Sequence, residues 1–172
     1  MNKKKNKKLW IIVGLIVLFI ALAMGIFKMG SGKKEYVVGK DITIDEINEF
    51  YDTYYNINFN ALYQRYYFYV QDGKHFFYHE KREKKNDYGP LNEEDITESG
   101  TIELDDETWN AFFEYLKDGT IIKRQESDED GDAGPWYYLY WDKDKGEIQE
   151  YHFVSYGREK EFEQFCISLK GE

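Results

Sequence analysis

The stretch Ala61–Arg82, ALYQRYYFYVQDGKHFFYHEKR, predicts the central feature of the fold. Two runs rich in Tyr and Phe flank the dipeptide Asp72-Gly73, and Asp-Gly is a favoured pair for the two-residue turn of a β-hairpin. Aromatic side chains favour strands because they pack well on a pleated surface. We therefore predict two antiparallel strands, Ala61–Gln71 and His75–Arg82, joined at this turn.

The residues that follow this hairpin predict more strands and two helices. The predicted strands are Ile96–Leu104 and Thr120–Gln125, with a second hairpin formed by Trp136–Trp141 and Glu147–Ser155. Asp105 is the predicted N-cap of a helix that ends at Gly119, and a second helix covers Glu159–Leu169. The apolar stripes of the two helices repeat one spacing: Trp109, Phe112, Phe113 and Leu116 in the first, and Phe162, Phe165, Cys166 and Leu169 in the second. This spacing indicates either two helices that pack on a sheet or a duplicated hairpin-plus-helix unit.

The segment 41–57, DITIDEINEFYDTYYNI, is ambiguous between helix and strand. Thr43 and Glu46 have the spacing of a capping box, which marks the start of a helix. The Phe, Tyr and Thr residues that follow favour a strand. We predict a short helical turn followed by a strand. The whole pattern then predicts a single α+β domain over 41–172, in which two amphipathic helices cover one face of an antiparallel sheet built from hairpins.

The N-terminal segment predicts where this domain is located. Leu9–Phe27 holds 19 residues without a charge, which as a helix span about 28 Å, close to the thickness of a bilayer. The lysines of residues 1–8 predict a cytoplasmic N-terminus. We therefore expect a single-pass transmembrane signal-anchor at 9–27, a flexible spacer at 28–40 and an extracytoplasmic domain at the cell membrane. The alternative is a signal peptide cleaved after Ala21-Leu22-Ala23, but a cleavable apolar region is usually only about 7–15 residues long.

Charge and cysteine content narrow the range of partners. Residues 1–32 hold six lysines and no acidic residue, so residues 33–172 carry 17 basic and 33 acidic side chains, a formal charge of −16. Such an acidic domain is not expected to bind nucleic acid, which requires a basic surface. The single cysteine, Cys166, forms no intramolecular disulfide and is predicted to be a buried, inert thiol.

No motif predicts a catalytic, cofactor or metal site. His75 and His79 lie in a predicted strand, where four residues span about 13 Å, too far to hold one ion. The acidic loop that begins at Asp128 has Ala133 and Leu139 where a calcium-binding EF-hand loop requires Gly and Glu. Nucleophile and phosphate-binding motifs are absent from the sequence. A hydrolase would require a buried carboxylate opposite a second one, which the sequence alone does not reveal.

The aromatic strands are the best functional candidate. Strand alternation places six of their rings on a possible ligand-binding face: Trp136, Tyr138, Tyr140, Tyr63, Tyr67 and Tyr69. If the helices cover the other face, these rings stay partly exposed, and an exposed aromatic patch indicates binding. We expect a non-catalytic binding or interaction module whose partner is an envelope protein or glycan. The alternatives are envelope-glycan binding or carboxylate-based glycan hydrolysis on this face, and cross-strand pairing that only stabilises the sheet.

Three runs resemble a known group of sequences: Tyr63–Glu83, Asp95–Leu104 and Gly134–Trp141. They are similar to segments of an uncharacterised group of exported or membrane-anchored proteins from Gram-positive, gut-type bacteria, and the likeness covers roughly residues 60–170. The resemblance implies export and a single domain. Because the group has no assigned activity, it implies no functional residue in this chain.

Overall fold

The computed structural model describes residues 35–53, 62–84, 91–125, 135–141 and 147–171. The chain divides into two units between Lys34 and Glu35, and all of the described residues belong to the second unit. The predicted cytoplasmic tail, the transmembrane segment at 9–27 and the acidic loop at 128–134 lie outside the described residues. No helix within the described ranges is long and apolar enough to cross a membrane.

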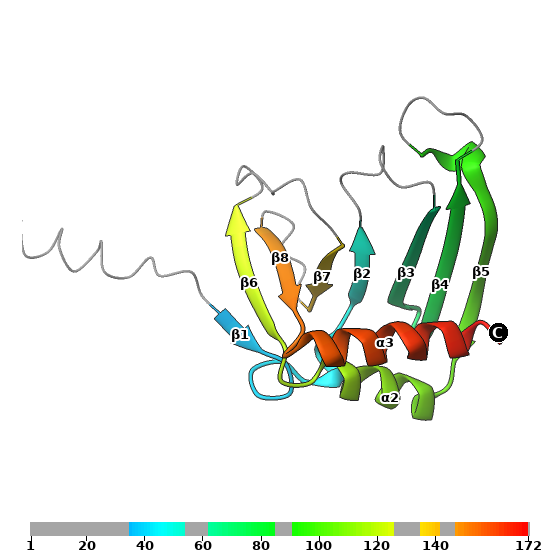
Figure 1. Ribbon diagram of the computed structural model, residues 1–172. Coiled ribbons are helices and arrows are strands. Elements are labelled where there is room, and N and C mark those ends of the chain that lie inside the picture. The colour runs from blue at the N-terminus through cyan, green and yellow to red at the C-terminus, as the bar shows by residue number, and fades with distance from the viewer. Residues whose placement is uncertain (1–34, 54–61, 85–90, 126–134, 142–146, 172) are drawn as a thin grey trace, which may run out of the picture. The chain divides into compact units, whose positions relative to one another are not determined.

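The described strands form one antiparallel sheet flanked by helices, which confirms the predicted α+β class. The strands are β1 (Glu35–Val37), β2 (Glu49–Thr53), β3 (Leu62–Gln71), β4 (Lys74–Glu83), β5 (Ile96–Leu104), β6 (Thr120–Gln125), β7 (Trp136–Tyr140) and β8 (Glu147–His152). The helices are α2 (Asp106–Leu116) and α3 (Tyr156–Leu169), with short 3-10 turns η1 (Ile44–Glu46) and η3 (Glu93–Asp95). The eight strands lie in the order β1-β6-β8-β7-β2-β3-β4-β5 (Figure 1).

The predicted first hairpin is present as β3 and β4. Ten residue pairs join the two strands, from Leu62 opposite Glu83 to Gln71 opposite Lys74. The turn residues Asp72 and Gly73 have φ values of 52° and 74°. This left-handed pair is the geometry that Asp-Gly favours in a two-residue turn, because glycine has no side chain to clash there.

The predicted turn and strand before this hairpin are also confirmed. Thr43 and Glu46 form the capping box of η1, and β2 follows it. β2 pairs with β7 on one side and with β3 on the other, so it joins the two parts of the sheet. The parts do not repeat one topology, because β3, β4 and β5 lie in chain order whereas β8 lies between β6 and β7. The strand order therefore contradicts a duplicated unit.

Helices α2 and α3 lie side by side on the same face of the sheet, as predicted (Figure 1). Asp105 caps α2 by accepting a hydrogen bond from the backbone N–H of Thr108 at 2.8 Å. α3 begins at Tyr156, three residues earlier than predicted, because Ser155 caps it through the N–H of Arg158. The stripe positions that are buried are Trp109, Phe112 and Leu116 of α2, and Phe162 and Cys166 of α3.

The role of Gly119 differs from the prediction. The residue with a left-handed backbone after α2 is Asp118, with φ of 65°, so Gly119 does not end the helix through a positive φ. Gly119 is buried against the ring of Tyr151, where a Cβ atom would overlap the ring. The Tyr151 hydroxyl donates a hydrogen bond to the Leu116 carbonyl oxygen at 3.0 Å. Glycine is therefore required for close packing between β8 and the end of α2.

The domain begins earlier than the spacer prediction implies. Glu35–Val37 forms the edge strand β1, which pairs with β6. Val38 and Ile42 are fully buried on either side of a turn that contains Gly39, with φ of 86°. The lysines and glycines that surround this segment give it the composition of a spacer. The buried side chains of Val38 and Ile42 nevertheless pack this segment into the core.

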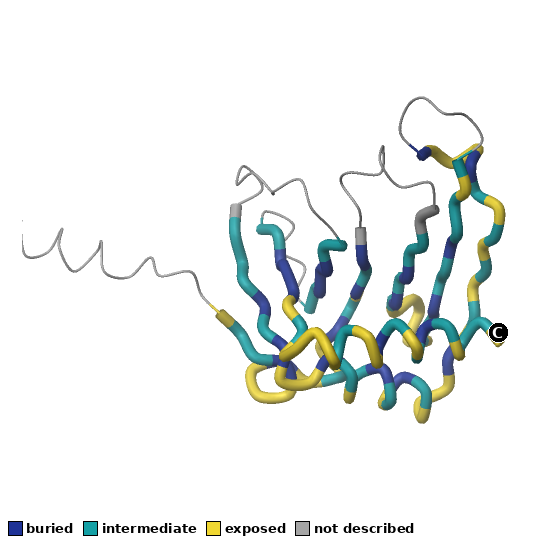
Figure 2. The backbone as a smooth tube through the Cα atoms, in the orientation of Figure 1, coloured by how far each residue is buried: buried dark blue, intermediate teal, exposed yellow. Residues whose placement is uncertain are grey.

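The core centres on the ring of Phe50 in β2. Its ring centroid lies 5.7 Å from that of Phe112 in α2 and 5.3 Å from that of Phe162 in α3. It also contacts Phe68 of β3 at 6.5 Å and Tyr151 of β8 at 5.4 Å. Burial decreases toward the β5 edge, where half-buried and exposed positions alternate (Figure 2). The core is therefore an aromatic cluster between the middle of the sheet and both helices.

We predict that Gly119→Ala destabilises the fold, whereas Gly157→Ala in α3 does not. Overpacking of a tight site costs about 1–3 kcal/mol, and the added methyl group at position 119 meets the Tyr151 ring. At position 157 the nearest contact of the added methyl group, to the Ser155 hydroxyl, is an ordinary 3.7 Å. The free energy of unfolding in urea measures both effects. Equal stability of the two variants would contradict the packing role of Gly119.

Candidate functional site

The sheet has one face that no described helix or strand covers, because α2 and α3 both lie on the opposite face (Figure 1). On the uncovered side, strand register aligns Tyr138, Tyr51, Tyr67 and Tyr78 in one row across β7, β2, β3 and β4. A second row aligns Tyr140, Glu49, Tyr69 and Phe76 across the same strands. We call these eight residues the open face.

The rings of the open face contact one another across strand boundaries. The Tyr51 ring lies 5.4 Å from Tyr138, 6.2 Å from Tyr140 and 5.9 Å from Tyr67, measured between centroids. Tyr67 stacks on Tyr69 at 4.8 Å. Tyr69 in turn stacks on Phe76 at 5.3 Å. Ring contacts thus run without a break over four strands.

Four of the six aromatic residues predicted for a binding face come together here. Tyr67, Tyr69 and Tyr140 are half-buried, whereas Tyr138 is only 3% exposed. Trp136 lies two residue pairs beyond Tyr138 on β7, opposite Thr53 of β2. Tyr63 is paired with Arg82 of β4, but its side chain lies outside the part that the structure describes.

Trp136 also lines a cavity of about 250 Å³ at the end of β7 and β8. Glu150 and His152 line the same cavity, and their side chains approach to 3.2 Å. The indole N–H of Trp136 is buried and has no hydrogen-bond partner among the described residues. Trp136 therefore belongs to the margin of the open face.

Sequence reasoning missed Tyr51, Phe76 and Arg65 as members of this surface. Tyr51 belongs to the segment that was ambiguous between helix and strand. Arg65 alternates with the tyrosines of β3, so its side chain lies on the same face, with its guanidinium carbon 5.4 Å from the Tyr51 ring centroid and 6.0 Å from that of Tyr67. The Nε atom of Arg65 is buried, and no residue in the described part of the chain accepts a hydrogen bond from it. Strand alternation through Phe50, Tyr51 and Asp52 was the signal that could have found Tyr51.

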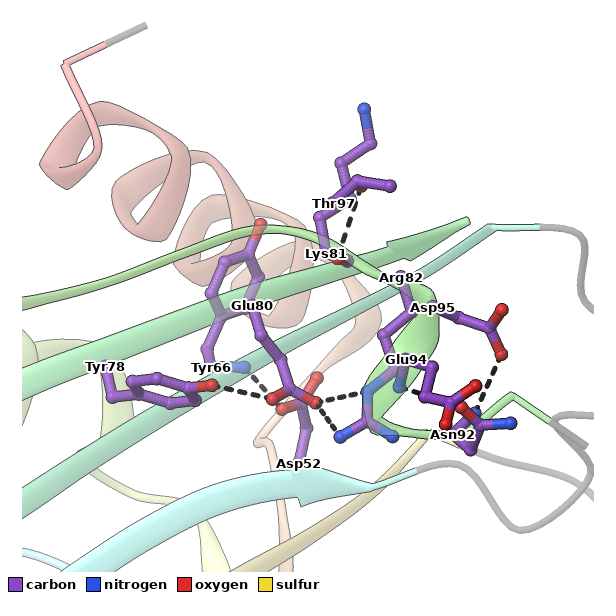
Figure 3. A network of polar contacts seen from close by, with 10 residues as sticks. All are labelled: Asp52, Tyr66, Tyr78, Glu80, Lys81, Arg82, Asn92, Glu94, Asp95 and Thr97. Carbon is purple, nitrogen blue, oxygen red and sulfur yellow. Dashed lines mark hydrogen bonds and ion pairs between the residues drawn. The ribbon is translucent and has the colours of Figure 1, made fainter. Parts of the chain in front are cut away.

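A buried ion pair borders the tyrosine rows. Glu80, only 4% exposed, accepts a hydrogen bond from the Tyr78 hydroxyl at 2.7 Å and from Arg82 Nε at 2.8 Å (Figure 3). Burial, together with the Glu80 carboxylate, raises the pKa of Tyr78 to about 12. Burial and the nearby Glu49 carboxylate likewise raise the pKa of Tyr67 to about 12. The hydroxyls of Tyr67 and Tyr78 thus remain protonated at physiological pH.

The opposite, helix-covered side holds a different kind of site around Asp52 of β2. Asp52 is 5% exposed and accepts a hydrogen bond from the backbone N–H of Tyr66 at 2.7 Å (Figure 3). It lines a cavity of about 230 Å³ that also includes Glu163 of α3. Burial raises the pKa of Asp52 to about 7, and the Glu163 carboxylate adds to the increase. A carboxylate pair is therefore present, but away from the open face.

The histidines and the cysteine lie at separate places. His75 stacks on Trp109 with 4.3 Å between centroids, and His79 Nδ1 lies 3.3 Å from a Glu98 carboxylate oxygen. Across the described ranges, no group of three His, Cys, Asp or Glu side chains has a geometry suited to a metal ion. Cys166 is fully buried, as predicted, and burial raises the pKa of its thiol.

Comparisons with known proteins add nothing to this geometry. The chain matches no protein-family model, no curated protein and no solved structure. Functional inference therefore depends on the two faces of the sheet.

We predict that Asp52→Asn changes how stability depends on pH. The folded protein keeps a proton on Asp52 up to about pH 7, whereas an unfolded Asp loses it near pH 4, so the free energy of unfolding falls as pH rises between these values. Three pKa units correspond to a decrease on the order of 4 kcal/mol. Asn keeps an oxygen that accepts the Tyr66 N–H but has no charge. The free energy of unfolding of the variant therefore lacks this decrease between about pH 4 and pH 7.

The test is urea unfolding at pH 4.5 and pH 8. The variant is expected to be more stable than the natural chain at pH 8, with a much smaller difference at pH 4.5. Asp72→Asn, in the exposed hairpin turn where Asn also tolerates a positive φ, is the matched control. A pH dependence that Asp52→Asn leaves unchanged would contradict the raised pKa of Asp52.

Proposed function

We propose that the domain is a non-catalytic binding module and that its open face binds a glycan chain of the cell envelope. The observation that carries this proposal is the unbroken set of ring contacts across four strands, on a face without a covering element in the described part of the chain. Stabilisation of the sheet alone would not require that face to stay uncovered. Exposed aromatic surface of this kind is typical of binding sites.

The chemistry of the open face suits a sugar better than an apolar protein surface. Each sugar ring has a flat side of C–H groups and a rim of hydroxyls. The open face offers flat tyrosine rings whose hydroxyl tips donate hydrogen bonds, and it places the charged groups of Glu49 and Arg65 between them. Leu, Ile, Val and Met side chains, which anchor many protein partners, are missing from the two tyrosine rows.

A binding role is also favoured over hydrolysis on this face. Glu80 is bonded to Tyr78 and Arg82, so it is committed to an ion pair and is poorly placed to transfer a proton. The carboxylate whose pKa burial raises, Asp52, lies on the other side of the sheet. The predicted anchor at 9–27 places the module outside the membrane, where envelope glycans are within its reach. The extracytoplasmic location of the module is itself part of what we propose.

The experiment compares retention of the purified full chain on insoluble cell-wall polysaccharide. The double variant Tyr67→Ser/Tyr140→Ser removes two rings of the open face, and each aromatic contact contributes about 1 kcal/mol. We expect retention to fall at least tenfold. Tyr156→Ser, which removes a tyrosine that is 71% exposed on α3, is the matched control and is expected to bind normally.

Thermal unfolding of all three chains checks that the substitutions leave the fold intact. Failure of the natural chain to bind any envelope polysaccharide would overturn the proposal, as would an equal loss in the Tyr156→Ser control. Capture of an envelope protein through Tyr67 and Tyr140 without glycan retention would assign the same face to a protein partner instead.

A further inference from the structure

The cavity beside Asp52 has the features of a second ligand site, independent of the open face. It lies between β2, β3, β7 and α3 and has a volume of about 230 Å³. Its lining includes Asp52, Gln64, Tyr66, Tyr137, Phe162 and Glu163. Sites for drug-sized ligands occupy roughly 300–1,000 Å³, so this cavity suits a smaller molecule or a single side chain.

The Asp52 carboxylate has no compensating cation in the described part of the chain. One of its oxygens accepts the Tyr66 N–H, and no ion pair to Asp52 is formed by any described Lys, Arg or His. Arg65 lowers the pKa of Asp52, but its side chain lies on the other face of the sheet, against the rings of Tyr51 and Tyr67. Buried carboxylates normally have a paired cation, because removing the charge from water is costly.

The surroundings of the cavity increase the negative field. Glu163 is a second carboxylate in the lining, and Glu159 accepts a hydrogen bond from the Tyr137 hydroxyl at 3.2 Å. Lys160 pairs with Glu163 at 2.7 Å, but its side chain is nearly half exposed, so solvent screens much of its charge. The carboxylates would therefore stabilise a cation inside the cavity.

The remaining walls favour an organic cation over a metal ion. Tyr66, Tyr137 and Phe162 are aromatic, and the faces of aromatic rings attract ammonium groups. Carboxylates combined with rings form the usual recognition site for alkylated amines, whereas metal ions require several oxygen, nitrogen or sulfur ligands. The described residues offer no group of three metal-binding side chains. We propose that this cavity binds a small alkylammonium ion, with Asp52 as its counter-ion and Tyr66, Tyr137 and Phe162 as its walls.

The site is expected to respond to pH. Five groups from the packed elements affect Asp52: Tyr66 and Arg65 of β3, Tyr137 of β7, and Glu163 and Cys166 of α3. Because burial raises the pKa of Asp52 to about 7, the empty site holds a proton in mild acid. An ammonium ion must displace that proton, so affinity is expected to rise about tenfold or more from pH 5.5 to pH 8.

Isothermal titration of the full chain with choline and with n-butylammonium tests the proposal. The matched neutral probe is 3,3-dimethyl-1-butanol, which has the shape of choline without its charge. We expect both ammonium ions to bind at pH 8 and the neutral probe to bind at least tenfold more weakly. Nα-acetyl-lysine methylamide, as a third ammonium probe, shows whether a lysine side chain of a protein also fits or only a free amine.

Asp52→Asn is expected to weaken binding of choline at least tenfold at pH 8 and to abolish the pH dependence. Tyr137→Phe keeps the ring and is expected to change affinity less than threefold, whereas Tyr137→Leu removes the ring and weakens binding. Glu103→Gln, on the far side of the sheet beside Lys74, is the control. Unfolding curves confirm that each variant is folded.

Three results would overturn the proposal. The first is that neither ammonium ion binds at millimolar concentration. The second is equal binding by the natural chain and Asp52→Asn. The third is binding of Ca²⁺ at Asp52 that the ammonium ions do not compete with. Asp52 and Tyr137 lie on the helix-covered side and are not part of the open face. Loss of amine binding in their variants with intact glycan retention therefore separates failure of this proposal from failure of the proposed function.

Discussion

The contacts of the Phe50 ring are the interaction on which the rest of this structure depends. β2 is the strand that joins the two parts of the sheet, and its second residue, Phe50, is fully buried. Its ring contacts Phe112 of α2 and Phe162 of α3. One side chain thus fixes both helices against the strand that holds the sheet together. Truncating such a ring generally costs about 3–5 kcal/mol, a large part of the stability of a small domain.

This arrangement forces the two faces of the sheet to differ. Both helices are held near Phe50 on one side, so the aromatic residues of alternate parity lie on the other side without a helix to cover them. Those residues cover one another instead, through the ring contacts of Tyr51 with its neighbours in β7 and β3. The same β2 strand presents Asp52 to the helix side, where Glu163 of α3 lies in the same cavity. The open face and the Asp52 cavity are therefore two consequences of the alternation of one short strand.

Local sequence signals predicted most of the elements. Asp72-Gly73 predicted the hairpin turn, Asp105 predicted the cap of α2, and both apolar stripes predicted the helices. These features depend on residues close together in the chain, which is why the sequence sufficed. Strand order and the cavity around Asp52 depend instead on contacts between distant segments, such as the pairing of β2 with β7. Gly119 shows the same limit, because its role is set by Tyr151, 32 positions later in the chain.

The candidate site was only partly predicted, because part of it also depends on contacts between distant segments of the chain. Period-two alternation placed Tyr67, Tyr69, Tyr138 and Tyr140 on common faces of their own hairpins. Alternation within a hairpin does not show whether two hairpins point their tyrosines to the same side, and only β2 between them settles this. Tyr51 of β2 completes the surface, and its segment was the one where helix and strand signals conflicted. Asp52 could not be picked out from the 33 acidic residues of the sequence, because it differs from most of them in its burial, which the sequence does not show.

Hydroxyl-radical footprinting of the full chain, with oxidation of each tyrosine measured by mass spectrometry, tests most directly whether the two faces differ in this way. Adjacent tyrosines of β3 provide the comparison within one strand. We expect rapid oxidation of Tyr67, Tyr69 and Tyr140 and protection of Tyr66 and Tyr137. Oxidation of Tyr66 and Tyr137 as fast as Tyr67, or protection of all five, would contradict an open aromatic face opposite a helix-covered core.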